Sequence, residues 1–273
     1  MDVPSSQLLT APGASPTRWM TFLHGILGRG ANWRGFARRL VERAPAWGAI
    51  LVDLRAHGDS LELPEPDTVE RCAQDLVRLE AKLGLPIAGA LGHSFGGKVA
   101  TMYALEARSI RQLFVIDSRL GATDGGADAI EASRVIAMLA AAPDRFRDRP
   151  AFLAHVREAG FDEALARWLA QSLAARPDGG FRFSLDTRRI RALMDDYASL
   201  DLWDAIDPPR AGLAVHLVIG GRSDTYGPAG IAKANDLAER NEAVFAHVIE
   251  DASHWVHVDA PDRLLDIVVE ALA

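Results

Sequence analysis

A serine between glycines is the first feature of this sequence that points to chemistry. Residues 90–99 read ALGHSFGGKV, which places Ser94 in the pattern G-x-S-x-G. The pattern alone is common, but a strand-like run over 86–91 precedes it and a helix-like run over 95–108 follows it. A sharp turn from a strand into a helix is the setting of a nucleophile elbow, which exposes a serine hydroxyl at the edge of a sheet. The sequence therefore predicts Ser94 as a nucleophile.

The glycines of this stretch have a steric purpose in such a turn. Side chains at Gly92 and Gly96, two residues to either side of the serine, are expected to collide. Gly97 is expected to let the helix pack close to the sheet. We interpret His93, next to the serine, as a packing residue whose side chain points away from the serine hydroxyl.

A histidine late in the sequence is placed to act as the base. A serine hydroxyl is a weak nucleophile at neutral pH, so it needs a base, and the base needs an orienting acid. The stretch EDASHWVHVDAP, residues 250–261, follows the last predicted strand. His254 lies just past the end of that strand and is the predicted base. His257, one turn further along, is the weaker candidate.

Two aspartates at strand ends compete for the role of the acid. Asp224 follows the apolar run 213–219, and the spacing from Gly221 matches the usual position of the acid after the penultimate strand. Asp117 ends the run RQLFVID, one strand after the nucleophile. Both loops open toward the same histidine. The sequence favours Asp224 and keeps Asp117 as the alternative.

Two backbone amides are expected to bind the oxyanion that forms when a serine attacks a carbonyl. One is the amide of Phe95, directly after the nucleophile. The other lies in the loop FLHGILGRGANW, residues 22–33, whose glycines allow the backbone to approach a substrate. Within this loop we assign the second amide to Ile26.

Two further polar features are interpreted as scaffold. His24 lies in the loop that carries the second amide, and we expect a structural role for it. The motif DLRAHGDS, residues 53–60, predicts a tight turn held by its own polar groups, with Arg55 and Asp59 paired across it.

Strand-like and helix-like segments alternate along most of the chain. This alternation predicts an α/β fold, with a mostly parallel central sheet and helices on both faces. Strands are expected over 18–23, 48–53, 86–91, 111–117, 213–219 and 244–250, with a further edge strand within 5–10. Helices are expected over 31–44, 68–83, 95–108, 229–239 and 261–272.

Residues 118–205 break this rhythm, because they contain no convincing strand. We expect them to form a helical insertion between the core segments 1–117 and 206–273. An insertion at this point would lie over the carboxyl ends of the strands as a cap on the ligand crevice, and the alternative is a helical subdomain without a role in binding. Its helices are expected over 127–141, 149–157, 161–175 and 187–199, with a turn at 176–180.

Composition excludes several classes of function. The chain has 273 residues and a formal charge of −7, without a long basic run, so no binding of nucleic acid is expected. Its one cysteine, Cys72, excludes an internal disulfide. There is no apolar run of about 18 residues for a membrane span, and the first residues do not resemble a secretory signal. A soluble, cytoplasmic protein is expected, with a small acyl substrate and a homodimer as an open possibility.

Together, these motifs resemble the α/β-hydrolase superfamily. HGILGRGANW, DLRAHGDS, GHSFGGK and ASHWVH occur in the family's order and at its distances, so the resemblance covers nearly the whole chain. The lysine of GHSFGGK and the phrase HWVHVDAPD are similar to the YbfF-type esterases and the related ABHD11-type hydrolases. The resemblance implies hydrolysis of carboxylic esters or thioesters under a helical cap by a Ser–His–Asp triad, without a metal or organic cofactor.

The resemblance also bears on the acid. In YbfF-like esterases, the aspartate that matches Asp117 is implicated, and the loop that matches GGRSDTYG lacks an aspartate at the place of Asp224. This sequence has both, so the assignment stays open.

The same triad is compatible with other reactions. Cleavage of carbon–carbon bonds, lactone opening and perhydrolysis use the same residues, and a pocket that only captures a ligand is a further alternative. Aromatic residues of the insertion are expected to be mostly core, with some lining an acyl pocket. Three arginines, at 188, 189 and 191, are interpreted as a solvated helix face, with binding of an anionic group such as a CoA phosphate as the alternative.

Overall fold

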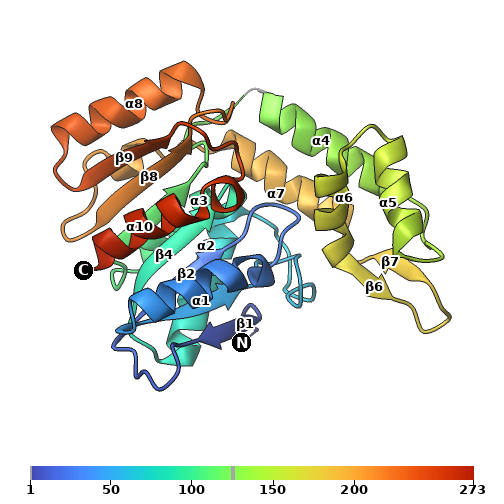
Figure 1. The fold of residues 1–273 in the computed structure, drawn as a ribbon, viewed down its shortest axis with the longest axis horizontal. Coiled ribbons are helices and arrows are strands. Elements are labelled where there is room, and N and C mark those ends of the chain that lie inside the picture. The colour runs from blue at the N-terminus through green and yellow to red at the C-terminus, as the bar shows by residue number, and fades with distance from the viewer. Residues whose placement is uncertain (1, 124–126) are drawn as a thin grey trace.

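A sheet covered by helices forms the main body, and a second group of helices lies to one side of it (Figure 1). The computed structural model describes residues 2–123 and 127–273, and in these residues seven strands form the sheet in the order β1-β3-β2-β4-β5-β8-β9. β1 runs antiparallel to β3, and the other neighbouring pairs are parallel. The strands are β1 (Ser6–Leu9), β2 (Arg18–Leu23), β3 (Trp47–Val52), β4 (Ile87–His93), β5 (Gln112–Ile116), β8 (Ala214–Gly220) and β9 (Val244–Ile249).

The predicted strands of the core are all present, with ends that differ by at most two residues. They were recognisable because helices cover both faces of a parallel sheet, so its strands are nearly continuous apolar runs. All six residues of β3, for example, are buried. The edge strand expected within 5–10 is β1, which pairs with β3.

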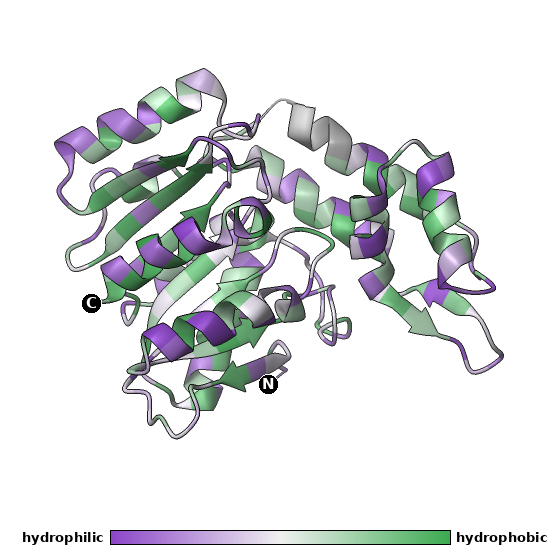
Figure 2. Ribbon diagram, in the orientation of Figure 1, coloured by the Kyte–Doolittle hydropathy of each residue, from purple (hydrophilic) through white to green (hydrophobic). Residues whose placement is uncertain are grey.

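Helices pack on both faces of the sheet (Figure 1). One face carries α1 (Arg34–Arg43) and α10 (Pro261–Leu272), and the other carries α2 (Val69–Leu83), α3 (Phe95–Glu106) and α8 (Gly227–Arg240). Figure 2 shows the apolar strands between outer helices of mixed polarity. Shorter helices are η1 (Gly30–Trp33), η3 (Asp204–Ile206) and α9 (Val256–Asp259). Over the described ranges, no helix has both the length and the apolar character needed to cross a membrane.

The elements between β5 and β8 form the second group, which we call the insertion (residues 118–205). Its elements are α4 (Ala127–Ala140), α5 (Arg149–Glu158), α6 (Glu163–Leu169), η2 (Ala170–Ser172), β6 (Leu173–Ala175), β7 (Phe181–Phe183) and α7 (Thr187–Ser199). Residues 124–126 of this range lie outside the described residues.

One expectation for the insertion is wrong. The predicted helix over 161–175 ends at Leu169, and β6 and β7 form an antiparallel hairpin where no strand was expected. The turn between them uses Gly179 and Gly180, with φ of +86° and +77°. On β7, the ring of Phe183 stacks on Phe152 of α5 at 6.0 Å. Packing within the insertion therefore determines the secondary structure of this segment and overrides its local helical pattern.

Helix α7 is tied to the core by ion pairs. Arg189 binds both carboxylate oxygens of Asp67 at 2.6 and 2.7 Å, and Asp67 is buried. Arg188 pairs with Glu65 at 2.7 Å on the surface. These two arginines are therefore occupied at the junction with the core, which argues against the alternative that they bind an anionic group of a substrate. The expectation of a solvated helix face fits the exposed Arg188 but is wrong for Arg189, whose side chain is mostly buried.

Candidate active site

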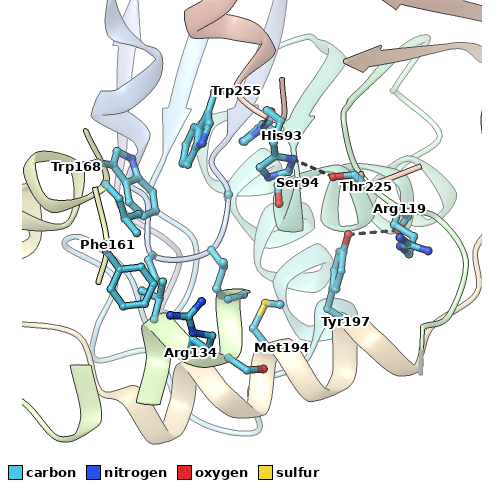
Figure 3. A pocket seen from close by; sticks show the side chains of 18 of the residues that line it. His93, Ser94, Arg119, Arg134, Phe161, Trp168, Met194, Tyr197, Thr225 and Trp255 are labelled. Carbon is cyan, nitrogen blue, oxygen red and sulfur yellow. Dashed lines mark hydrogen bonds between the residues drawn. The ribbon is translucent and has the colours of Figure 1, made fainter. Parts of the chain in front are cut away.

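The chain turns sharply between β4 and α3, and Ser94 lies at the turn. Its φ of +53° and ψ of −121° are a conformation that costs a residue with a side chain roughly 1–3 kcal/mol. Two hydrogen bonds hold it: the Ser94 amide donates to the carbonyl of Ile116 at 3.0 Å, and the Ser94 carbonyl accepts from the amide of Gly97 at 2.8 Å. The side chain lines a pocket, as Figure 3 shows.

The glycines around Ser94 fill the steric role that the sequence predicts. A Cβ atom on Gly92 would lie 2.0 Å from the carbonyl oxygen of Gly96, and one on Gly96 would lie 2.6 Å from the carbonyl oxygen of His24. A Cβ on Gly97 would lie 2.3 Å from the side chain of Ser118, which follows β5. Alanine at any of these positions would therefore force the backbone of the turn to move.

A buried carboxylate lies against the imidazole of His254. Oδ2 of Asp117 is 2.7 Å from Nδ1 of His254, and the Asp117 side chain is fully buried. The amide of Gly220 donates to Oδ1 at 2.9 Å, and the hydroxyl of Ser223 donates to Oδ2 at 2.6 Å. A carboxylate only accepts hydrogen bonds, so it can satisfy all three donors at once. The arrangement fixes the ring of His254 with Nδ1 turned toward the aspartate.

The other candidate acid lies apart from this contact. Asp224 is exposed, and in the described part of the chain its carboxylate makes no hydrogen bond to His254. Its backbone carbonyl accepts from Arg119 at 3.4 Å. The geometry therefore goes against the preference of the sequence for Asp224 and favours Asp117. The physical reason is that loop conformation, and not spacing along the chain, decides which side chain points inward.

Two hydroxyl residues in the loop after β8 were missed by sequence reasoning. Thr225 Oγ1 lies 3.1 Å from Nδ1 of His254 and 3.0 Å from the hydroxyl oxygen of Ser223. They flank Asp224 in the stretch RSDT, and this pairing of hydroxyls beside a candidate acid is a signal that could have found them.

Because Nδ1 of His254 faces Asp117 and Thr225, Nε2 is the ring nitrogen left for Ser94. No hydrogen bond joins Ser94 and His254 within the described ranges, and such contacts are often long in substrate-free sites.

The two amides assigned to the oxyanion border this turn. Phe95 is the first residue of α3, so its amide has no acceptor inside the helix. Ile26 lies in the loop after β2, where a Cβ on Gly25 would be 3.4 Å from Cβ of Ser94. Ile26 and Ser94 line the same pocket. Over residues 2–123 and 127–273, neither amide donates to another residue, so both are available to a substrate oxygen.

Two buried histidines hold the loop that carries Ile26. Nε2 of His57 accepts from the amide of Leu27 at 3.0 Å, and Nε2 of His24 accepts from the amide of Leu54 at 3.0 Å. Each ring donates its single N–H proton, on Nδ1, to a nearby carbonyl at 2.8 Å. His24 therefore has the structural role that the sequence suggests. His57, whose part was not foreseen, fixes the residue next to Ile26.

The motif over 53–60 is scaffold, but its expected ion pair is wrong. Arg55 binds Asp75 at 2.8 Å and lies 3.5 Å from Asp67, in a fully buried cluster. Asp59 instead donates its amide to the carboxylate of Asp53 at 2.9 Å. A guanidinium without solvent needs buried carboxylates as partners, and the exposed Asp59 is not one.

The buried histidines predict that acid destabilises the fold. Burial lowers the pKa of His24 to about 4 and that of His57 to about 3, from about 6.5. Their contribution to stability is complete above about pH 6.5 and is lost as the pH falls toward these values, because the unfolded chain takes up the protons first. At pH 5 each costs about 2 kcal/mol. Urea unfolding at about pH 7.5 and about pH 5 measures the loss.

A His57→Gln variant tests whether protonation of His57 contributes to this loss of stability. Glutamine does not titrate but can still accept from the amide of Leu27, so the variant should lose less stability between the two pH values. Equal urea midpoints for the parent protein at both pH values would contradict the prediction.

Two further histidines lie beside the site, and of these His93 borders the pocket. Nε2 of His93 donates to the carbonyl of His254 at 2.8 Å, and His93 is buried, in agreement with a packing role. The ring of His257 packs against Trp33 at 4.7 Å. His254 lines the pocket and His257 does not, so the geometry favours His254 of the two candidates.

A pocket of about 850 Å³ is lined by residues of the insertion together with residues that follow the carboxyl ends of the strands. In Figure 3, Trp168 and Phe161 lie on one side of the cavity, and Tyr197 and Arg119 lie on the other. Trp168 of α6 packs edge-to-face against Trp255, next to His254, at 5.2 Å. The pocket therefore has a large apolar wall that residues of the insertion and of the core build together.

Comparisons with known proteins agree with the fold. The profile of the Alpha/beta hydrolase family matches residues 22–267. The sn-1-specific diacylglycerol lipase ABHD11 of Mus musculus is 29% identical over 265 residues, covering 93% of this chain and 80% of the mouse protein. Esterase YbfF of Escherichia coli is 30% identical over 253 residues, covering 90% of this chain and 89% of the bacterial protein. A marine microorganism esterase of known structure superposes with a TM-score of 0.83 at 22% identity, over 98% of each chain.

Proposed function

The chain belongs to the Alpha/beta hydrolase family, and we propose that it is a serine hydrolase that cleaves carboxylic ester or thioester bonds through an acyl-enzyme. One observation carries the proposal: the buried carboxylate of Asp117 lies 2.7 Å from the His254 ring, beside the strained turn that exposes Ser94 to a pocket. Nucleophile, base and acid thus come from the ends of different strands and meet at one edge of the sheet.

In the first half of the reaction, His254 Nε2 takes the hydroxyl proton of Ser94 as Oγ forms a bond to the acyl carbon. The carbonyl oxygen becomes an oxyanion and accepts from the amides of Phe95 and Ile26. Asp117 holds the neutral ring of His254 in the tautomer with its proton on Nδ1, and it stabilises the imidazolium that forms. The tetrahedral intermediate then expels the alcohol or thiol, which takes its proton from His254.

In the second half, water replaces the leaving group. His254 takes a proton from water as its oxygen attacks the acyl carbon of the Ser94 ester, and the same two amides bind the second oxyanion. Collapse of this intermediate breaks the bond to Ser94, which recovers its proton from His254. The acid leaves, and the site returns to its starting state with one water consumed.

The apolar wall of the pocket predicts a role for Trp168 with longer acyl groups. Trp168→Ala should raise KM for p-nitrophenyl octanoate by about tenfold, which corresponds to about 1.4 kcal/mol of lost apolar contact. The acetate ester is expected to be too short to contact Trp168, so its kcat/KM should change little. Michaelis kinetics over the acetate-to-octanoate series measure the difference.

Phe245→Ala is the matched control for this series. It also replaces an aromatic ring by a methyl group, but Phe245 is half-exposed on the edge strand β9 and does not line the pocket. It should leave the chain-length profile unchanged. Equal losses with acetate and octanoate in Trp168→Ala would show that the indole does not contact the acyl chain.

A further inference from the structure

A buried lysine on the helix behind the nucleophile contacts both ends of the insertion. Lys98 lies four residues after Ser94 on α3 and is fully buried. A lysine loses much hydration free energy in such a place and is rarely found there without partners. Since Lys98 lies on an otherwise apolar stretch of α3, its ammonium needs hydrogen-bond acceptors from other elements.

The ammonium donates to three backbone carbonyls. Nζ lies 3.0 Å from the carbonyl oxygen of Gly121, 2.7 Å from that of Tyr197 and 2.6 Å from that of Leu200. Three protons thus meet three acceptors, with none left over. Gly121 lies where the chain enters the insertion after β5, and Tyr197 and Leu200 lie where α7 ends and the chain returns to the core.

The end of α7 is a favourable place for this cation. The last carbonyls of a helix lack partners inside the helix and carry a partial negative charge. Nζ also lies 4.4 Å from the centroid of the Tyr197 ring. Burial lowers the pKa of Lys98 to about 8; Asp201 and Asp196 oppose this shift, and Arg119 adds to it. The side chain is therefore mostly charged at neutral pH.

Tyr197 connects this cluster to the pocket. Its ring packs against Phe95 at 5.9 Å, and it lines the cavity that contains Ser94. Its hydroxyl donates to the carbonyl of Arg119 at 3.4 Å, on the segment that follows Asp117. A shift of the end of α7 would therefore move one wall of the pocket relative to the nucleophile.

We propose that Lys98 is a positioning residue that fixes both ends of the insertion to the nucleophile helix and so holds Tyr197 as a wall of the substrate pocket. This role rests on the proposed hydrolase function for its kinetic readout. It acts through the insertion and not on the proton transfers at Ser94. The side chain therefore matters most for substrates large enough to contact the insertion.

The experiment compares Lys98→Met with the parent protein. Methionine fills a similar volume but cannot donate to the three carbonyls. We expect KM for p-nitrophenyl octanoate to rise about tenfold at a nearly unchanged kcat, while kcat/KM for the acetate ester and the rate of fluorophosphonate labelling stay within about twofold. Equal losses with both esters and with the label would overturn the proposal.

Hydrogen exchange gives a readout that does not depend on the reaction. In Lys98→Met, amides over 118–122 and 196–202 should exchange faster, while those over 94–97 keep their rates. Unchanged exchange in the first two segments would also overturn the proposal. If the parent protein hydrolyses no ester, the proposed function fails, and the exchange experiment still decides the role of Lys98.

Two further variants guard against a general loss of folding. Lys98→Gln keeps two donor hydrogens and should give a smaller change in the same direction, which provides the comparison if Lys98→Met does not fold. Lys82→Met removes an exposed lysine on α2 and should leave kinetics and exchange unchanged. An effect of Lys82→Met equal to that of Lys98→Met would show a general effect of charge.

Discussion

Replacing Ser94 with alanine is expected to lower kcat for ester hydrolysis by about a million-fold, to the level that binding and the oxyanion amides alone provide. Without Oγ there is no atom to form the acyl-enzyme, and the base has no proton to take. The substitution leaves the glycines of the turn and the contact between Asp117 and His254 intact. The measurement is the rate of p-nitrophenyl acetate hydrolysis together with fluorophosphonate labelling followed by intact mass.

Ser109→Ala is the matched control for this experiment. It removes a hydroxyl of the same kind from the segment after α3, where Ser109 does not line the pocket. It should keep the parent rate and one mass increment on labelling, whereas Ser94→Ala should show none. If Ser94→Ala hydrolysed the ester at the parent rate, the serine-hydrolase proposal would be abandoned.

The arrangement of the core could be predicted from the sequence because its physical causes are local and repeated. Strands covered on both faces are apolar throughout, as in β3, and the helices between them carry an apolar stripe. The hairpin of β6 and β7 lacked such a signal. Each strand has three residues, too few for a period to show, and contacts such as Phe183 on Phe152 define it.

The residues that support the site were harder to predict than those at its centre. Ser94 and His254 follow from motifs at strand ends. Lys98 and His57 act through backbone groups far along the chain, such as the carbonyl of Leu200 and the amide of Leu27. No spacing in the sequence encodes these pairs. For Lys98, the local signal that could have pointed to a structural role is a lysine on an apolar stretch of helix.

The choice between Asp117 and Asp224 shows most clearly what the sequence alone does not determine. β5 and β8 are neighbours in the sheet, so the loops after both strands open toward His254, and the sequence supplies an aspartate in each. Asp117 has φ of +39° and turns its carboxylate inward, whereas Asp224 faces solvent. The choice depends on backbone conformation at single residues, which neither apolar periodicity nor spacing records.

Asp117→Asn and Asp224→Asn, measured side by side, should therefore differ by orders of magnitude in kcat. We expect Asp117→Asn to lose about 10⁴-fold, because an amide has one acceptor oxygen in place of two and favours the wrong tautomer of His254. Three donors, from Gly220, Ser223 and His254, now meet one carbonyl and one NH₂ group, so at least one donor faces another donor. Asp224→Asn changes only an exposed carboxylate and should stay within about twofold of the parent rate.

The comparison also separates a catalytic acid from a structural one. Asp117→Asn should retain fluorophosphonate labelling at a greatly reduced rate, since Ser94 and the oxyanion amides remain, and its circular dichroism spectrum should match that of the parent. A loss confined to Asp224→Asn would reverse the assignment of the acid. Comparable losses in both variants would mean that the two carboxylates act together on His254, which requires the loop after β8 to turn Asp224 inward when substrate binds.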